Sequence, residues 1–357
     1  MKRIITGIMS LFLMSTVLLS GCKSNKATST EALNSGDKEI HSKLENYMKN
    51  YLANNQFNGS ILVAKDKKIL FENGYGMADA DNKLLNTPQT VFEIGSITKQ
   101  FTATAILMLK EKGLLSIQDT LDKYIPDYPY GSKIKIYNLL NHTTGLPDYQ
   151  VDSPKTLIEL IKNRPLDFDP GTKFKYCNSN YLLLGYIIEK VTGVSYEEYL
   201  NNNIFKPLKM THTGLMNNKD KVTGKAVGYE YIDQNSKAYY KGEESDPSML
   251  YAAGGLYSTV EDLLIWNNSL CSGKLLEEES LKEMFTPYLE DYGYGWIIHN
   301  LNGNKLIWHD GSIEGFSSLI IREIDKGNVI IILSNKGKDI SNLKKIVDTI
   351  LPIMSNS

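Results

Sequence analysis

The first residues that could carry chemistry are a serine and a lysine three positions apart, Ser96 and Lys99, at the start of a segment with helical spacing. Residues three apart lie on one face of a helix, so the amine can approach the hydroxyl. A serine becomes a nucleophile when a base takes its proton, and burial lowers the pKa of a lysine so that part of it is a free amine. The pair therefore predicts nucleophilic catalysis, although an N-capping serine followed by a solvated lysine gives the same spacing.

Two further short segments contain residue types suited to the same reaction. Tyr176 and Asn178 follow a Pro-Gly turn, and alternate positions of an extended segment point the same way. The tyrosine could exchange a proton and the asparagine amide could hold a substrate amide. His309 and Gly311 share a face of a predicted strand, where a glycine lets a substrate approach the backbone. The structural alternatives are a buried tyrosine, a turn-forming asparagine and a surface histidine beside a turn.

Taken together, the blocks that contain these residues resemble the penicillin-recognising serine hydrolases, on their class C β-lactamase-like branch. The Ser-x-x-Lys signature is shared by β-lactamases and penicillin-binding proteins. The resemblance extends over about residues 44–350. It rests on five blocks in the family's order: residues 92–99 (FEIGSITK), 139–146 (LLNHTTGL), 170–178 (PGTKFKYCN), 253–259 (AGGLYST) and 309–311 (HDG).

The resemblance implies a role for each of the first four residues. Ser96 is expected to attack a carbonyl and become acylated, with Lys99 as its activating base. Tyr176 is expected to carry a proton to the leaving group and then from the deacylating water. Asn178 is expected to bind a substrate amide. The resemblance implies neither a cofactor nor a metal.

The resemblance also implies how a substrate is held along the predicted C-terminal strand. The backbone N–H groups of Ser96 and Ser312 are expected to form the oxyanion hole, and His309 and Gly311 to contact the substrate. Many relatives carry lysine where this chain has His309. A histidine with an ordinary pKa near ~6.5 is mostly uncharged at pH 7, which disfavours recognition of a penicillin carboxylate. Glu314 in the following turn is predicted at the cleft rim, where it would favour an ammonium.

The first 21 residues have the layout of an export signal. Three residues with a basic start precede an uncharged, mostly apolar stretch at 4–20, and small residues precede Cys22. This resembles a bacterial lipoprotein signal, in which the cysteine becomes the lipidated N-terminus; a plain signal peptide or an uncleaved anchor helix are the alternatives. Residues 22–39 are polar and predict a flexible tether. We therefore predict a lipid-anchored protein on the extracytoplasmic face of the cell membrane.

The pattern of the remaining chain predicts one domain over residues 40–352 with an α/β (α+β) fold. Helical patterns occur near both ends, at 40–54 and 340–351, and others occur between about 100 and 250. Short strand patterns occur at 60–64, 69–71, 294–299, 305–309, 317–322 and 329–333. We expect one antiparallel sheet built from both ends of the chain, flanked by the N- and C-terminal helices, with a helical region inserted and the site between the two.

Charge and cysteine usage exclude other classes of protein. The formal net charge of -2 provides no strong field, which disfavours nucleic acid as a partner. No pair among the five histidines has i, i+4 spacing and no cysteines cluster, so a zinc site is not expected. The sequence leaves open whether Cys177 and Cys271 pair.

The leading interpretation is a cell-surface hydrolase of D-amino-acyl peptide or ester bonds in the bacterial envelope, like a D,D-carboxypeptidase or an esterase. Its substrates would be small molecules or D-amino-acyl groups of peptidoglycan or teichoic-acid type, with β-lactams as possible ligands. A β-lactamase is the first alternative. A penicillin-binding protein with little turnover is the second, which the complete set of site residues argues against.

Overall fold

The computed structural model describes residues 33–54, 57–217, 221–231, 239–242, 250–270, 272–301 and 304–355. The predicted export signal, Cys22, most of the predicted tether and Cys271 lie outside these ranges. Within them, no helix is both long enough and apolar enough to cross a bilayer.

A six-stranded antiparallel sheet joins the two ends of the chain, in the order β10-β11-β12-β13-β1-β2. The N-terminal hairpin pairs with the last strand, so that Gly59 of β1 lies opposite Ser334 of β13. The strands are β1 (Gly59–Lys65), β2 (Lys68–Tyr75), β10 (Ile297–Leu301), β11 (Asn304–Ile313), β12 (Phe316–Glu323) and β13 (Asn328–Ser334). The fold class predicted from the sequence is confirmed.

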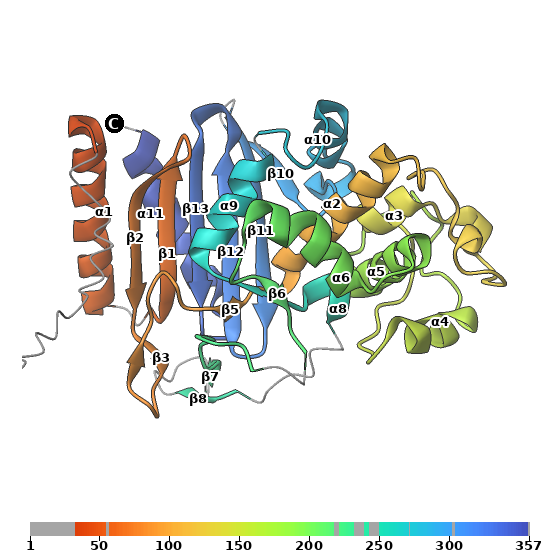
Figure 1. Ribbon diagram of the computed structural model, residues 1–357, viewed down its shortest axis with the longest axis horizontal. Helices are drawn as coiled ribbons and strands as arrows, with labels where there is room; N and C mark the ends of the chain where they lie inside the picture. The colour runs from red at the N-terminus through yellow and green to blue at the C-terminus, as the bar shows by residue number, and fades with distance from the viewer. Residues whose placement is uncertain are drawn as a thin grey trace, which may run out of the picture.

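Successive side chains along each strand point to opposite faces of the sheet, and each face packs into a different hydrophobic cluster. In β13, Ile330 and Ile332 pack with the terminal helices α1 (Ser35–Asn54) and α11 (Ile340–Ser355), whereas Ile331 and Leu333 belong to the cluster on the opposite face. Helix α9 (Val260–Leu270) covers that opposite face (Figure 1). The central strands are therefore covered on both sides, which explains their nearly continuous apolar sequences.

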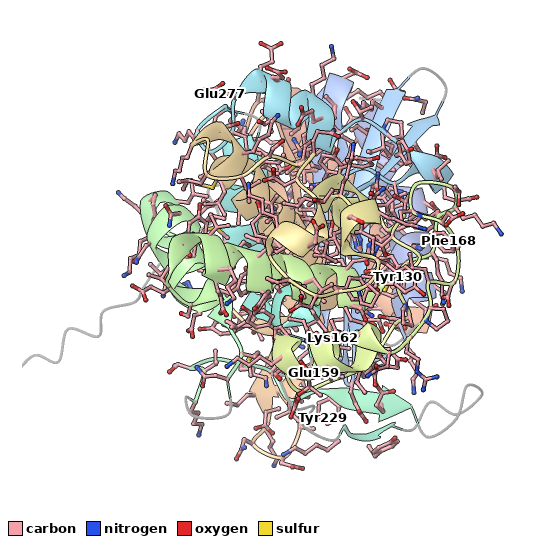
Figure 2. All side chains as sticks on the ribbon, turned by 90° about the vertical axis from the view of Figure 1, so that its right-hand side faces the viewer. Tyr130, Glu159, Lys162, Phe168, Tyr229 and Glu277 are labelled. Carbon is pink, nitrogen blue, oxygen red and sulfur yellow. The ribbon has the colours of Figure 1, made fainter. Side chains whose placement is uncertain are left out.

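The helical region lies beside the β10–β11 side of the sheet, and it faces the viewer in Figure 2. On its outer surface Glu159 and Lys162 form an ion pair of 3.2 Å. Its helices are α2 (Thr98–Glu111), α3 (Ile136–Leu140), α4 (Pro154–Lys162), α5 (Asn178–Thr192), α6 (Tyr196–Leu200), α7 (Lys206–Leu208), α8 (Tyr251–Gly254) and α10 (Glu278–Met284). Small sheets pair β3 (Met77–Asp79) with β4 (Leu84–Leu85), β9 (Leu256–Ser258) with β5 (Phe92–Glu93) and β6 (Gly214–Leu215), and β7 (Tyr229–Tyr231) with β8 (Tyr239–Lys241).

The boundary predicted between the tether and the domain is wrong, because it falls inside a helix. Helix α1 begins at Ser35, so residues 35–39 belong to it and not to a flexible segment. The Asn34 side chain accepts a hydrogen bond from the Asp37 backbone N–H at 2.8 Å, which caps the helix. The Asp37 carboxylate also pairs with Lys68 on β2 at 2.7 Å. These contacts start the helix although its first turn contains few apolar residues.

Candidate active site

Ser96 lies in a single 3-10 turn, Gly95–Ile97, that leads directly into α2. One turn on, the Lys99 Nζ donates a hydrogen bond to the Ser96 Oγ at 3.0 Å, as the spacing predicts. Gly95 has a φ of +49°, and a Cβ there would come within 3.0 Å of the Ser312 backbone nitrogen. The glycine therefore lets strand β11 lie against the turn that carries the serine.

Lys99 is completely buried, and its amine is surrounded by acceptors. Besides Ser96, the Nζ contacts the Asn178 Oδ1 at 2.8 Å and the Ala253 carbonyl at 2.6 Å. Burial lowers the pKa of Lys99 to about 7, partly opposed by the negative charge of Asp148. A free amine is therefore accessible at neutral pH, where an ordinary lysine is almost fully protonated. The two protons of the free amine satisfy the two carbonyl acceptors, which leaves the lone pair for the Ser96 hydroxyl.

Tyr176 completes the contacts of the serine hydroxyl. Solvent reaches 36% of the residue, but its hydroxyl interacts with the Ser96 side chain inside the site. Desolvation raises the pKa of Tyr176, outweighing the opposite effect of Ser96. The side chain therefore rests as a neutral phenol, suited to give a proton. The His142 ring lies 4.4 Å from the Tyr176 ring, centroid to centroid, and supports it from behind.

Asn178 reaches Lys99 from a different local structure than the sequence predicts. We expected an extended segment through Tyr176 and Asn178, but Asn178 is the first residue of α5. The helix starts there because Asp148, from another part of the chain, accepts a hydrogen bond from the Ser179 backbone N–H at 3.1 Å. The Asn178 side chain still faces the site.

Gly311 and Ser312 on β11 lie against the nucleophile turn. A Cβ on Gly311 would come 2.1 Å from the Ile94 carbonyl oxygen. The glycine is thus required by the packing of strand against turn, in place of the direct approach to a substrate that the sequence suggested. The same packing brings the backbone nitrogen of Ser312 next to Gly95, the residue before Ser96, beside which the oxyanion hole is predicted.

His309 is buried, with 2% of its surface exposed, and both ring nitrogens have partners. The Nδ1 lies 2.6 Å from the Asp310 carbonyl oxygen, which can only accept, so Nδ1 carries the proton. The Nε2 then accepts from the Tyr292 hydroxyl at 2.9 Å. Desolvation lowers the pKa of His309 to about 4, so the ring is neutral across the physiological range. A direct hydrogen bond to a substrate would require it to give up one of these partners.

The two acidic residues that follow His309 in the sequence, Asp310 and Glu314, lie on different sides of the strand end. Asp310 points to the opposite side from His309, where its carboxylate lies 3.8 Å from Lys344 on α11. Glu314 is exposed in the turn between β11 and β12. Cys177, between Tyr176 and Asn178, is a buried free thiol whose pKa burial raises to about 12. It is therefore unreactive as a thiolate.

Sequence reasoning missed Asp148 and Tyr292 as members of the site. Asp148 lies two positions after the block at 139–146, so its proximity to a recognised block was the available signal. Tyr292 has no such signal, because it reaches His309 and His142 through an irregular segment. Both residues join the site through contacts between distant parts of the chain.

Two further observations delimit the site. Among the described residues, no group of three or more histidine, cysteine, aspartate or glutamate side chains is placed to hold a metal ion. A cavity of about 560 Å³ lies outside the catalytic constellation. Its lining is Gln118, Tyr137, Asn141, Glu279, Lys282, Glu283, Thr286, Pro287, Tyr288 and Tyr294, so it is not the place where Ser96 would meet a substrate.

A serine beside a buried lysine, where an antiparallel sheet meets a helical region, defines a serine hydrolase of the penicillin-recognising class. The β-lactamase family model matches residues 44–351, and the chain therefore belongs to that family. This confirms the resemblance drawn from the sequence blocks.

Individual relatives agree with this assignment. Penicillin-binding protein 4* of Bacillus subtilis (strain 168) is 32% identical over 314 residues, which cover 80% of this chain and 69% of the relative. The crystal structure of a penicillin-binding protein from Bacillus halodurans superposes with a TM-score of 0.77 at 27% identity, covering 86% of this chain and 98% of that one. A D-stereospecific amidohydrolase from Streptomyces sp. gives a TM-score of 0.69 at 27% identity, covering 84% and 94%.

Proposed function

We propose that the protein is a cell-surface serine hydrolase that acts through an acyl-enzyme on D-amino-acyl peptide or ester bonds of the bacterial envelope. The observation that carries this proposal is the fully buried Lys99 amine, 3.0 Å from the Ser96 hydroxyl. The D-stereospecific amidohydrolase among its structural neighbours supports a D-configured acyl group. The substrate would be a D,D-carboxypeptidase-type peptide or a D-alanyl-type ester.

In the proposed acylation, the Lys99 amine takes the Ser96 proton while the serine oxygen attacks the substrate carbonyl. The N–H groups of Ser96 and Ser312 stabilise the negative charge that forms on the carbonyl oxygen. The neutral Tyr176 phenol gives its proton to the departing amine or alcohol, and the proton held by Lys99 restores it. Water then hydrolyses the acyl-enzyme by the same groups in reverse order.

The neutral state of His309 bears on which substrate is preferred. With its pKa near 4, this position supplies no cation for a carboxylate on the substrate. The first alternative, a β-lactamase, would have to bind the carboxylate of a penicillin without it. The second alternative, a penicillin-binding protein with little turnover, would form the acyl-enzyme but release it slowly.

The proposal places the protein on the outer surface of the cell membrane, held by a lipid on Cys22. Its support is the order of basic, apolar and small residues before that cysteine. A lipid anchor would keep the site close to envelope polymers.

The decisive experiment compares four substrates on the full chain in detergent: a D-alanyl ester, a D-Ala-D-Ala peptide, a fluorescent penicillin and nitrocefin. We expect turnover of the ester or peptide, with a covalent adduct on Ser96 seen by mass spectrometry. Ser96→Ala should abolish both while leaving the fold intact, because it removes one oxygen from a 3-10 turn. An adduct that persists in Ser96→Ala refutes the assignment of the nucleophile. Rapid nitrocefin hydrolysis without ester or peptide turnover would establish the β-lactamase alternative.

A further inference from the structure

We propose that Asp148 is a positioning residue of this site, which holds the Asn178 side-chain amide with its oxygen turned to Lys99. The inference rests on the proposed function, because it concerns the state of the amine that activates Ser96. Asp148 would act through Asn178 and Lys99, without contact to the reacting atoms.

The carboxylate of Asp148 is fixed on the first turn of α5. Its Oδ1 accepts hydrogen bonds from the Ser179 backbone N–H at 3.1 Å and from the Ser179 Oγ at 3.5 Å. Its Oδ2 lies 3.5 Å from the Asn178 Nδ2. A carboxylate at a helix N-terminus is also favoured by the helix dipole. One residue thus caps the helix and faces the amide that contacts Lys99.

The orientation of the Asn178 amide decides whether the lysine has its acceptor. An amide has an accepting oxygen and a donating nitrogen, and a carboxylate can only accept. With Nδ2 towards Asp148, the Oδ1 is placed 2.8 Å from the Lys99 Nζ. A flipped amide would set its N–H₂ against the amine and its oxygen against the carboxylate, so both contacts would become repulsive. The 3.5 Å distance between the Asn178 Nδ2 and the Asp148 Oδ2 is long for a hydrogen bond. The negative charge of Asp148 therefore selects the amide orientation by attracting the N–H₂ group.

The charge of Asp148 also reaches the amine itself. Asp148 raises the pKa of Lys99, against the larger effect of burial. Within the described ranges Asp148 has no lysine or arginine ion-pair partner, and the nearby Lys175 pairs with Asp167 instead. Its exposed position weakens the interaction by solvent screening.

Among the described residues, the other titratable groups that contact Lys99 or interact with its charge are uncharged at neutral pH. Desolvation lowers the pKa of the two imidazoles and raises the pKa of the phenols and of the thiol. These groups are His142, His309, Tyr176, Tyr181 and Cys177. The Asp148 carboxylate is therefore the charged group whose removal should alter the titration of Lys99.

Asp148→Asn removes the charge and keeps the size of the side chain. An amide oxygen can still accept from the Ser179 N–H, but its nitrogen then no longer orients the Asn178 amide. We expect the ascending limb of the acylation pH profile to move down by about 0.3–1 pH unit. We also expect the plateau rate to fall about 3- to 10-fold. Losing an acidic residue should thus extend activity, relative to the plateau, towards lower pH.

The matched control is Asp152→Asn. Asp152 lies on the same loop and its carboxylate accepts from the Thr156 hydroxyl at 2.7 Å, so this variant makes the same charge change without contact to Asn178. Asp148→Ser is the second test variant, because a serine oxygen can also cap α5. It should show the same shift even if Asp148→Asn does not fold.

The assay is acylation of the full chain in detergent by a neutral activated ester, from pH 5 to 9. A shifted limb in Asp148→Asn and Asp148→Ser, with Asp152→Asn unshifted, supports the proposal. A lower plateau with an unshifted limb in both variants overturns it, because a capping role alone predicts that result. If the wild type shows no limb near pH 7 and Ser96→Ala is still acylated, the proposed function fails instead.

Discussion

The buried lysine should reduce the stability of the protein in return for catalysis, and Lys99→Met tests both effects. Methionine has a similar length and no charge, so it removes the desolvated amine without opening a large cavity. We expect the variant to lose acylation by about 10³-fold or more, because no base then faces Ser96. At pH 6 we expect it to be more stable than the wild type.

The size of the stability change follows from the displaced pKa. The pKa of Lys99 falls from 10.5 to about 7, and the side chain is fully buried, so solvent screening does not reduce the effect. At about 1.36 kcal/mol per unit this costs the wild type about 5 kcal/mol at pH 6. The variant leaves the Asn178 Oδ1 and the Ala253 carbonyl without their donor, at about 1–3 kcal/mol each. With about 2 kcal/mol for each of the two carbonyls, the expected net stabilisation at pH 6 is about 1 kcal/mol.

The direction in which stability changes with pH follows from the direction of the Lys99 pKa shift. The folded-state pKa lies below the unfolded value, so the unfolded chain binds more protons between about pH 7 and pH 10.5. The free energy of unfolding of the wild type therefore rises with pH across that window. The advantage of Lys99→Met should fall by about 3 kcal/mol between pH 6 and pH 9, and so disappear or reverse.

Thermal unfolding of both proteins at pH 6 and pH 9 measures the effect, with an expected difference in Tm of about 1–2 degrees at pH 6. Lys110→Met is the control, because Lys110 lies on the same helix but is ion-paired to Glu283 at 2.7 Å and partly exposed. The reasoning is refuted if the difference in Tm between Lys99→Met and wild type is the same at both pH values. It is also refuted if wild-type acylation does not rise through about pH 7.

Four other outcomes are expected. Tyr176→Phe should slow hydrolysis of a peptide or alkyl ester by about 10²–10⁴-fold and that of a p-nitrophenyl ester much less, since only the former need a proton from the phenol; equal losses would contradict this role. His309→Lys should speed acylation by carboxylate-bearing penicillins at pH 8 relative to a neutral ester, and an unchanged rate ratio would exclude the charge argument. Gly311→Ala should lose activity at least 10²-fold or fail to fold, because its Cβ would lie 2.1 Å from the Ile94 oxygen. Circular dichroism reports whether the variant folds and the ester assay reports its activity. Wild-type activity would disprove the close packing of Gly311 on Ile94. Cys22→Ser should release the protein from membranes, so persistent membrane fractionation after signal cleavage would show that the lipoprotein reading is wrong.

The parts of the site that sequence predicts are those set by local geometry. The contact between Ser96 and Lys99 follows from one helical turn, and the strands follow from short apolar runs between turn residues. The helical start at Asn178 was not predictable from its neighbours, because its cap is Asp148, 30 positions earlier. The role of Gly311 was misassigned for the same reason, since the atom that excludes a side chain there belongs to Ile94.

The pairing of the first and last strands has a consequence for how the chain acquires activity. β1 lies between β2 and β13, and the Gly95 turn rests on β11, so the nucleophile is held by strands that follow it by more than 200 residues. Contacts of such sequence separation form late and slow the folding of a domain. During synthesis Ser96 and Lys99 emerge long before the strand that supplies Ser312. A nascent or truncated chain that ends before β11 therefore contains the reactive pair but cannot assemble the site around it.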